Sequence, residues 1–275
     1  MQKSREMNSA LTAVSETLYV PLAGRIYASR NFPQILHDKT ALALEQKIPR
    51  GVSIFNGQTE YTLLASAVRS KNMDAAVTDF LSRNEGGIVV NLGCGLDTGF
   101  YRCSAGTCWY ELDLPEVISL REGLLGIQEN DISIPSSLFD EGWTGLIKDE
   151  ADGKPVCFLA SGLFYYFQKS DILSLIRRLA EIPNAEIVFD TVNSKGMKRM
   201  AGYMKQLGHE DVVMYFFVDN AETLAREIGG AVSVIEERDY YSDVKERRGM
   251  KLITRISMTV SDMFHMVKMV SLKLN

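Results

Sequence analysis

The sequence lacks the features that direct a protein to membranes or to nucleic acid. No apolar run approaches the roughly 18 residues that a membrane-spanning helix needs. The first ten residues are polar and mixed in charge, which argues against a signal peptide. The net charge is −5, and no basic cluster exceeds Arg177-Arg178 or Lys245-Glu-Arg-Arg248. We therefore expect a cytoplasmic protein whose partner is neither a membrane nor a nucleic acid.

Residues suited to metal, disulfide or triad chemistry are equally scarce. The four cysteines lack C-x-x-C spacing and fall in or near predicted strands, which is typical of buried thiols in a reducing compartment. The three histidines show neither metal-site nor triad spacing, and His209 is only a weak candidate for a base. The sequence thus indicates no metal and identifies no catalytic residue.

The first 85 residues favour helices. Three segments carry apolar residues at i, i+3 and i+4 spacing: Ser9–Tyr27, Asp38–Gln46 and Tyr61–Leu81. Breaks are predicted at Pro21, Pro33 and Pro49–Gly51. A segment without strands cannot form half of a Rossmann sheet. Residues 1–85 are therefore predicted to form a helical cap against the mouth of a sheet, within the same compact unit.

Residues 86–275 show the alternation of an α/β protein. Five short apolar runs are predicted strands: Ile88–Leu92, Cys108–Leu112, Asp131–Ile134, Val156–Ala160 and Glu186–Thr191. Helices are predicted between them, over Pro115–Gly126, Leu138–Lys148 and Lys169–Glu181. This alternation is typical of a parallel sheet built from right-handed βαβ units.

The C-terminal part adds two helices and two strands to this pattern. The predicted helices are Asn220–Ile228, with Asp219 as N-cap, and Lys251–Phe264. The predicted strands are Ala231–Glu236 and Met266–Leu274. Together with the five earlier strands they predict a seven-stranded sheet whose last strand is inserted antiparallel.

A glycine-rich turn follows the first predicted strand. Asn91-Leu-Gly-Cys-Gly-Leu-Asp-Thr98 comes directly after Ile88–Val90, and its glycines let the backbone turn sharply and approach a ligand. Asp113 closes the next strand, 18 residues beyond Gly95, where a carboxylate can accept hydrogen bonds from both ribose hydroxyls. The combination predicts a nucleoside site, whereas the turn alone would also suit an ordinary α/β protein.

The turn does not complete the G-x-G-x-x-G pattern, because Thr98 replaces the third glycine. That glycine permits close helix–strand packing under a pyrophosphate, so its absence disfavours a dinucleotide-dependent oxidoreductase. S-adenosylmethionine (SAM) fits better, with its adenosine at Asp113 and its amino-acid tail over Gly93–Gly95. The predicted fold is a Rossmann-like, seven-stranded class I SAM-dependent methyltransferase sheet with an N-terminal helical cap.

The turn through Arg102, followed by Glu111-Leu-Asp-Leu-Pro-Glu-Val-Ile118, resembles the leucine carboxyl methyltransferase family. Within that family it is most similar to the bacterial O-methyltransferases related to the tetracenomycin polyketide enzyme. Further similar stretches are Val14–Thr17 with Pro21–Arg25, Arg69–Asp74, Ser137–Trp143 and Phe189-Asp190. The resemblance spans roughly residues 9–240 and implies the family's fold, cofactor and methyl-transfer chemistry.

The resemblance also implies a cofactor site, carried over position by position. Its residues are Arg69, Asn91, Gly93, Gly95, Asp97, Asp113, Leu114, Ser137, Leu138 and Ser161. Arg69 would hold the carboxylate of the methionine part in a charge-assisted contact. Asn91 and Asp97 would shape the turn, although Asp97 can equally cap the following helix. Asp113 would bind the ribose hydroxyls.

Two positions depart from the pattern of the family. Ser137 would border the adenine with Leu138, where many relatives carry an acidic residue. Ser161 stands where the family usually has glutamate before glycine, so a carboxylate beside the sulfonium is lost. That loss would weaken cofactor binding or mark altered chemistry.

Aromatic residues lie just past the end of the fourth predicted strand, where open α/β sheets bind ligands. Tyr165 and Tyr166 are therefore candidate substrate-binding residues, and Tyr203 is a weaker one. Packing in the core explains such aromatic residues nearly as well.

Together these features predict a SAM-dependent O-methyltransferase that acts on a carboxylate or phenol of a small molecule, as in polyketide tailoring. The cofactor carries the activated methyl group, so the protein mainly supplies alignment and desolvation. No convincing base is present, which favours an acceptor that ionises readily. Two alternatives stay open: a methyltransferase of a protein C-terminal carboxylate, and a non-catalytic protein that binds SAM or its demethylated product. The sequence specifies neither the acceptor nor the oligomeric state.

Overall fold

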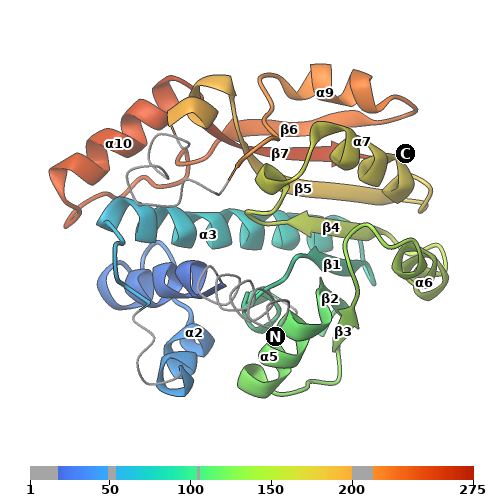
Figure 1. Cartoon of the computed structure of the whole chain (residues 1–275), viewed down its shortest axis with the longest axis horizontal. Coiled ribbons are helices and arrows are strands. Elements are labelled where there is room, and N and C mark those ends of the chain that lie inside the picture. The colour runs from blue at the N-terminus through green and yellow to red at the C-terminus, as the bar shows by residue number, and fades with distance from the viewer. Residues whose placement is uncertain (1–17, 49–53, 104–105, 200–212) are drawn as a thin grey trace, which may run out of the picture.

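The computed structural model describes residues 18–48, 54–103, 106–199 and 213–275 (Figure 1). Within these ranges a single sheet has the strand order β3-β2-β1-β4-β5-β7-β6. The strands are β1 (Ile88–Leu92), β2 (Trp109–Asp113), β3 (Asp131–Pro135), β4 (Val156–Ala160), β5 (Ala185–Val192), β6 (Ser233–Asp239) and β7 (Val267–Lys273). Strands β1 to β5 run parallel, while β7 is antiparallel to both β5 and β6. The predicted fold class and the antiparallel last strand are confirmed.

The central strands are buried on both faces of the sheet, and this is why they could be predicted from the sequence. Every residue of β1, β4 and β5 is buried, because helices cover both faces of a parallel sheet. Continuous apolar runs are the signature of such strands. The structure accordingly gives β1 and β4 the bounds that the sequence predicts, and it extends β5 by one residue at each end.

Helices form a layer on each face of the sheet. The helical elements are residues 18–31 and 194–199, α2 (Lys39–Leu44), η1 (Glu45–Lys47), α3 (Glu60–Arg83), α4 (Gly99–Cys103), α5 (Pro115–Leu125), α6 (Gly142–Ala151), η2 (Phe164–Tyr166), α7 (Lys169–Leu179), α9 (Ala221–Ile228) and α10 (Leu252–Met263). None of the helices in the described ranges is long and apolar enough to cross a membrane.

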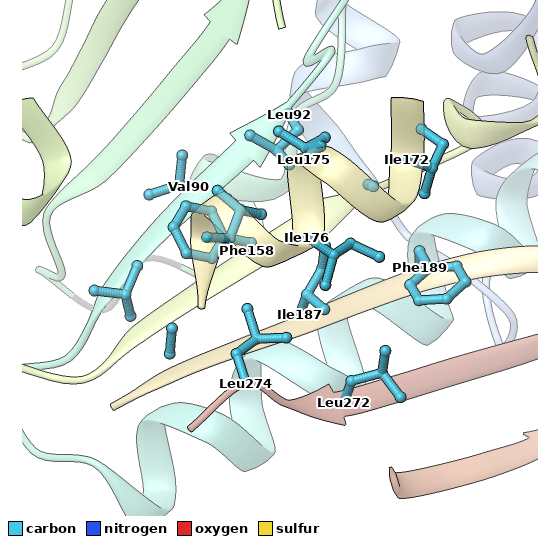
Figure 2. Close-up of a cluster of buried hydrophobic side chains, with 14 of the residues drawn as sticks. Val90, Leu92, Phe158, Ile172, Leu175, Ile176, Ile187, Phe189, Leu272 and Leu274 are labelled. Carbon is cyan, nitrogen blue, oxygen red and sulfur yellow. The ribbon is translucent and has the colours of Figure 1, made fainter. Parts of the chain in front are cut away.

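The larger core lies between the sheet and the layer that contains α6, α7 and α9. Helix α7 buries Ile172, Leu175, Ile176 and Leu179, which share one helical face because of their spacing. Figure 2 shows three of these side chains above Val90, Phe158 and Ile187 of the sheet, among other buried residues. This packing fixes the sheet on which the strand-end loops stand.

The opposite face is covered mainly by α3, which runs alongside β4 and β5 (Figure 1). Its N-cap is Thr59, whose hydroxyl accepts a hydrogen bond from the Thr62 N–H, while the Thr62 hydroxyl accepts one from the Thr59 N–H. Leu64, Val68 and Phe80 of α3 pack in one cluster with sheet residues. The helix thereby carries Arg69 to the carboxyl ends of the strands.

Two local predictions are wrong. Pro21 lies inside the helix of residues 18–31 rather than at a break. A proline within a helix removes one backbone donor, and here the helix is held by buried neighbours that include Leu22, Ala23 and Ile26. The N-cap of α9 is Asn220, not Asp219, because Asn220 has an extended backbone and its side chain accepts from the Thr223 N–H. Asp219 instead accepts from the Ser194 N–H at 2.8 Å.

The helix of residues 18–31 crosses α3 at Gly24, where the two backbones meet closely. A Cβ atom at Gly24 would lie 2.5 Å from the Leu63 carbonyl oxygen and 2.6 Å from the Ser66 Cβ. We predict that Gly24→Ala lowers the free energy of unfolding by about 1–3 kcal/mol, because a helical backbone cannot yield like a flexible side chain. Urea denaturation would measure it.

Gly123 provides the matched control for this variant. It lies within α5, and a Cβ there would have nothing within 4 Å. Gly123→Ala should therefore stabilise the protein by about 0.5–1 kcal/mol, the usual gain in helix propensity. Equal effects of the two substitutions would contradict the close helix crossing.

Candidate functional site

The turn after β1 requires glycine at two positions. Gly93 has φ +62° and Gly95 has φ +50°, the left-handed region that other residues rarely adopt. Space is restricted as well, since a Cβ at Gly93 would lie 2.6 Å from Leu163 Cδ1. At Gly95 it would lie 3.1 Å from Leu18 Cδ2. Both contacts are with the ends of flexible leucine side chains, so the left-handed backbone is the stronger reason for glycine at these positions.

Asp113 joins this turn to the end of β2. Its Oδ2 accepts from the Gly95 N–H and its Oδ1 from the Leu114 N–H, both at 2.8 Å. Burial raises the pKa of Asp113, and the two backbone donors partly offset that effect. The side chain is only partly buried, and each carboxylate oxygen can accept a second hydrogen bond. Asp113 can therefore hold a ligand hydroxyl beside the turn.

A buried polar cluster of Asn91, Glu111 and Arg121 lies next to the turn and bonds to its backbone. Asn91 donates to Glu111 at 2.8 Å, and Arg121 lies 2.6 Å from the other Glu111 oxygen. Burial raises the pKa of Glu111 to about 8, against the opposing charge of Arg121. Arg121 also donates to the backbone carbonyls of Gly95 and Asp97. The Asn91 side chain thus serves the turn from within the protein.

Sequence reasoning missed Arg121 as a functional residue. A signal was present, because Arg121 follows Val117 and Ile118 at the spacing of one helical face. All three are the buried residues of α5. An arginine on an otherwise apolar face indicates a buried partner, which here is Glu111.

A second ionic cluster lies beside the turn and consists of Arg25, Asp38, Asp74, Asp97 and Arg102. Asp38 caps α2 by accepting from the Ala41 N–H at 2.8 Å, and it also lies 2.6 Å from Arg102 and 3.4 Å from Arg25. Arg102 makes two further hydrogen bonds to Asp74, at 2.7 and 2.8 Å. The cluster ties α2, α3, α4 and the helix of residues 18–31 together.

Asp97 belongs to this cluster through its side chain. It lies 3.7 Å from Arg25 and 3.6 Å from Arg102, and it accepts from the Gly99 N–H at the start of α4. Burial opposes ionisation, yet Arg102 and Arg25 outweigh it and lower the pKa of Asp97. Of the two alternatives for Asp97, the structure shows the bond to the helix start.

A cleft of about 370 Å³ opens beside the same cluster. Its lining includes Lys39, Lys71, Asp74, Tyr101 and Arg102. None of the lining residues belongs to the glycine turn or to a strand end. The cleft is therefore separate from the predicted cofactor site.

Arg69 lies at the ends of β4 and β5 and contacts Asp190. Its Nε is 2.7 Å from Asp190 Oδ2, which also accepts from the Tyr165 hydroxyl at 2.8 Å. The Gly162 N–H donates to Asp190 Oδ1 at 2.6 Å, next to the half-buried Ser161. Tyr165 is buried in this arrangement, whereas Tyr166 is 47% exposed.

The residues predicted to border the adenine follow β3. The Ser137 hydroxyl accepts from the Phe139 N–H at 3.4 Å, and Ser137 is only partly buried. Leu138 is buried, while Leu114 beyond β2 is 40% exposed. Tyr203 and His209 lie outside the described residues. The structure therefore places the other predicted positions along neighbouring strand ends, with Asn91 and Asp97 turned into the protein.

This arrangement defines a class of protein. A sheet of this order, a left-handed glycine turn after β1 and a carboxylate at the end of β2 belong to the class I SAM-dependent methyltransferases. The model of the leucine carboxyl methyltransferase family matches residues 18–180, which is more than half of the chain. The chain belongs to this family.

Individual relatives are more distant. The tetracenomycin polyketide synthesis O-methyltransferase TcmP of Streptomyces glaucescens is 26% identical over 80% of this chain and 81% of its own length. The S-adenosyl-L-methionine-dependent methyltransferase dpfgK of Gibberella zeae is 26% identical over 67% of this chain and 68% of its own.

Solved structures share the fold. A DUF574 family protein of Streptomyces avermitilis has a TM-score of 0.58 at 13% identity and covers 91% of this chain and 96% of its own. A SAM-dependent methyltransferase of Anabaena variabilis has a TM-score of 0.50 at 12% identity, covering 74% and 86%. The protein is a SAM-dependent methyltransferase by family, and its strand-end residues fit that cofactor: the glycines leave a backbone cradle, Asp113 offers hydrogen-bond acceptors for hydroxyls, and Arg69 offers a positive charge for a carboxylate.

Asp38 is the most deeply buried carboxylate of the cluster around the turn, with a side chain that is 0% exposed. We predict that Asp38→Asn lowers the free energy of unfolding by about 2–3 kcal/mol, because Arg25 and Arg102 lose their contacts with it, and the nearest carboxylate left to Arg25 is Asp97 at 3.7 Å. Equilibrium urea unfolding would test this. Glu45→Gln is the matched control, since Glu45 pairs with Arg30 at the surface. There a loss of only about 0–1 kcal/mol is expected, and a similar loss at Asp38 would contradict the account.

Proposed function

We propose that the protein transfers the methyl group of SAM to an oxygen atom of a small molecule, either a carboxylate or an acidic phenol. The resident cofactor supplies the methyl group already activated on a sulfonium. Methyl transfer is then an in-line displacement, and the protein contributes position and exclusion of water.

The observation that carries this proposal is that the polar groups beside the strand ends are already occupied. In the part of the chain that the structure describes, Asp190 accepts three hydrogen bonds. Tyr165 donates to that carboxylate, and burial raises its pKa well above the ordinary value. Of the two described histidines, His37 lines the separate cleft and His265 pairs with Asp239 on the outer strand β6. Among the described residues at the strand ends we find no free general base, which favours an acceptor that ionises by itself.

The proposal also assigns binding roles to the strand-end residues. Asp113 would accept from the ribose hydroxyls, and the amino-acid tail would lie over Gly93 and Gly95. Arg69 would offer its terminal N–H groups to the tail carboxylate, because its Nε–H already donates to Asp190. The similarity to TcmP, which is named an O-methyltransferase, supports oxygen as the acceptor atom.

A second candidate is a protein that binds SAM or its demethylated product without catalysis. Ser161 favours this reading, because the residue that follows β4 carries no charge to place beside the sulfonium. Turnover separates the two candidates.

Asp113 is predicted to control cofactor affinity. Asp113→Asn should raise the Kd for SAM at least about tenfold, because hydrogen bonds to a charged group contribute about 1.5–3 kcal/mol each. Titration calorimetry would measure it. Glu116→Gln, a nearby exposed carboxylate on α5, is the control and should leave the Kd unchanged. An unchanged Kd in Asp113→Asn would remove the ribose contact from the proposal.

The same contact sets a pH dependence. Ribose hydroxyls donate to the ionised carboxylate, so protonation of Asp113 competes with binding. Because burial raises the pKa of Asp113, SAM affinity should fall as the pH is lowered toward that pKa, and the fall should begin at a higher pH than for an ordinary aspartate, whose pKa is about 3.9. The slope should disappear in Asp113→Asn. A slope that persists in this variant would assign the titration to another group.

The acceptor class can be tested with matched aromatic compounds that carry a carboxylic acid, a phenol or a primary amine. The amine is placed on an aminomethyl group, because an alkyl amine is protonated at neutral pH, with a pKa of about 10. With labelled SAM, the wild-type protein should methylate acids or acidic phenols and leave this amine unmodified, because no base among the described strand-end residues would deprotonate it. Preferential methylation of the amine would overturn the proposal. SAM binding without turnover of any acceptor would favour the second candidate.

A further inference from the structure

Asp190 is a fully buried carboxylate that no reaction step requires. It lies near the end of β5 and is 0% exposed. Three elements donate to it: Arg69 of α3 at 2.7 Å, the Gly162 backbone at 2.6 Å and the Tyr165 hydroxyl of η2 at 2.8 Å. These donors fix the carboxylate in place and satisfy both oxygens.

Arg69 is held in one orientation by this carboxylate. The contact uses Nε, and a planar guanidinium bonded at Nε has its plane and its outward fork fixed. Burial would lower the pKa of Arg69, but Asp190 outweighs burial and raises it, so the cation persists. Gly162 leaves the necessary room, since a Cβ there would lie 2.6 Å from Arg69 Nη1.

A second arginine of α3 shows what a purely structural pair looks like. Arg83 meets Glu186 at the other end of β5 and gives both terminal nitrogens to its two oxygens, at 3.2 and 3.1 Å. Its Nε bonds to Asp79 at 3.0 Å. The two terminal nitrogens of Arg83 are therefore used by Glu186, whereas Asp190 accepts only from the Nε of Arg69, and the terminal nitrogens of Arg69 lie beside Gly162, just past β4, and near the Tyr240 hydroxyl.

We propose that Asp190 is a positioning residue for cofactor binding. It fixes Arg69 through Nε so that the terminal N–H groups meet the carboxylate of the amino-acid part of SAM. This inference rests on the proposed role of Arg69. Asp190 touches neither the methyl group nor the acceptor, and its effect is confined to ligands that carry the carboxylate.

Two ligands that differ in the amino-acid part provide the test. S-adenosylhomocysteine and 5′-methylthioadenosine share the adenosine and a neutral thioether, but only the first has the carboxylate. Calorimetric Kd values for both would be measured in the wild type, Asp190→Asn, Arg69→Gln and their double variant. Glu186→Gln, which breaks a buried pair on the same strand, is the matched control.

We expect Asp190→Asn and Arg69→Gln each to raise the Kd for S-adenosylhomocysteine at least about tenfold, as loss of a charge-assisted contact does. Methylthioadenosine should stay within about twofold of the wild type in both, since its contacts are untouched. The double variant should be no weaker than Arg69→Gln, because the two residues act as one unit. Glu186→Gln should change neither affinity.

Equal weakening of both ligands by Asp190→Asn would show a merely structural role and overturn the proposal. The proposal would also be overturned if Asp190→Asn kept both wild-type Kd values while Arg69→Gln bound S-adenosylhomocysteine weakly. Failure of the wild type to bind either ligand would instead refute the cofactor site itself. If Asp190→Asn does not fold, Tyr165→Phe keeps the ion pair and removes one donor. It should weaken S-adenosylhomocysteine selectively, and a non-selective effect would again overturn the proposal.

Discussion

The glycine turn after β1 keeps its left-handed backbone because charged groups hold it on several sides. Arg121 binds carbonyls of the turn from beneath, and Asp113 accepts its Gly95 N–H. On the far side Arg25 and Arg102 hold Asp97. These groups come from separate helices and strands, so the cofactor site is built on the rigid frame of the protein rather than on a free loop.

The fold could be predicted because its signals are local. Strand β4 is a continuous apolar run, β1 is apolar except at Asn91, and the turn between β1 and α4 needs glycine whatever surrounds it. Errors arose where two neighbouring signals competed. Asp219 and Asn220 both suit an N-cap, and only the backbone angles decide between them. Pro21 indicated a break because a proline signal does not reveal the packing that keeps the surrounding helix intact.

The pairing of charges in the site could not be predicted, since it depends on residues far apart in the chain. Arg69 and Asp190 are separated by 121 positions and meet only when α3 lies across the sheet. Arg121 gave a local signal, but its partners Glu111 and the turn carbonyls became clear only in three dimensions. Contacts of the site residues with the cofactor remain predictions, as does the identity of the acceptor.

In the proposed placement, the ribose of the cofactor lies at Asp113, its amino-acid tail lies over the glycines of the turn, and its carboxylate meets Arg69. A crystal structure of the protein with S-adenosylhomocysteine tests that placement most directly. We predict hydrogen bonds from both ribose hydroxyls to Asp113, and a homocysteine carboxylate on the terminal nitrogens of Arg69 with its Nε still on Asp190. A nucleoside bound away from Asp113, or a tail carboxylate that does not meet Arg69, would contradict it.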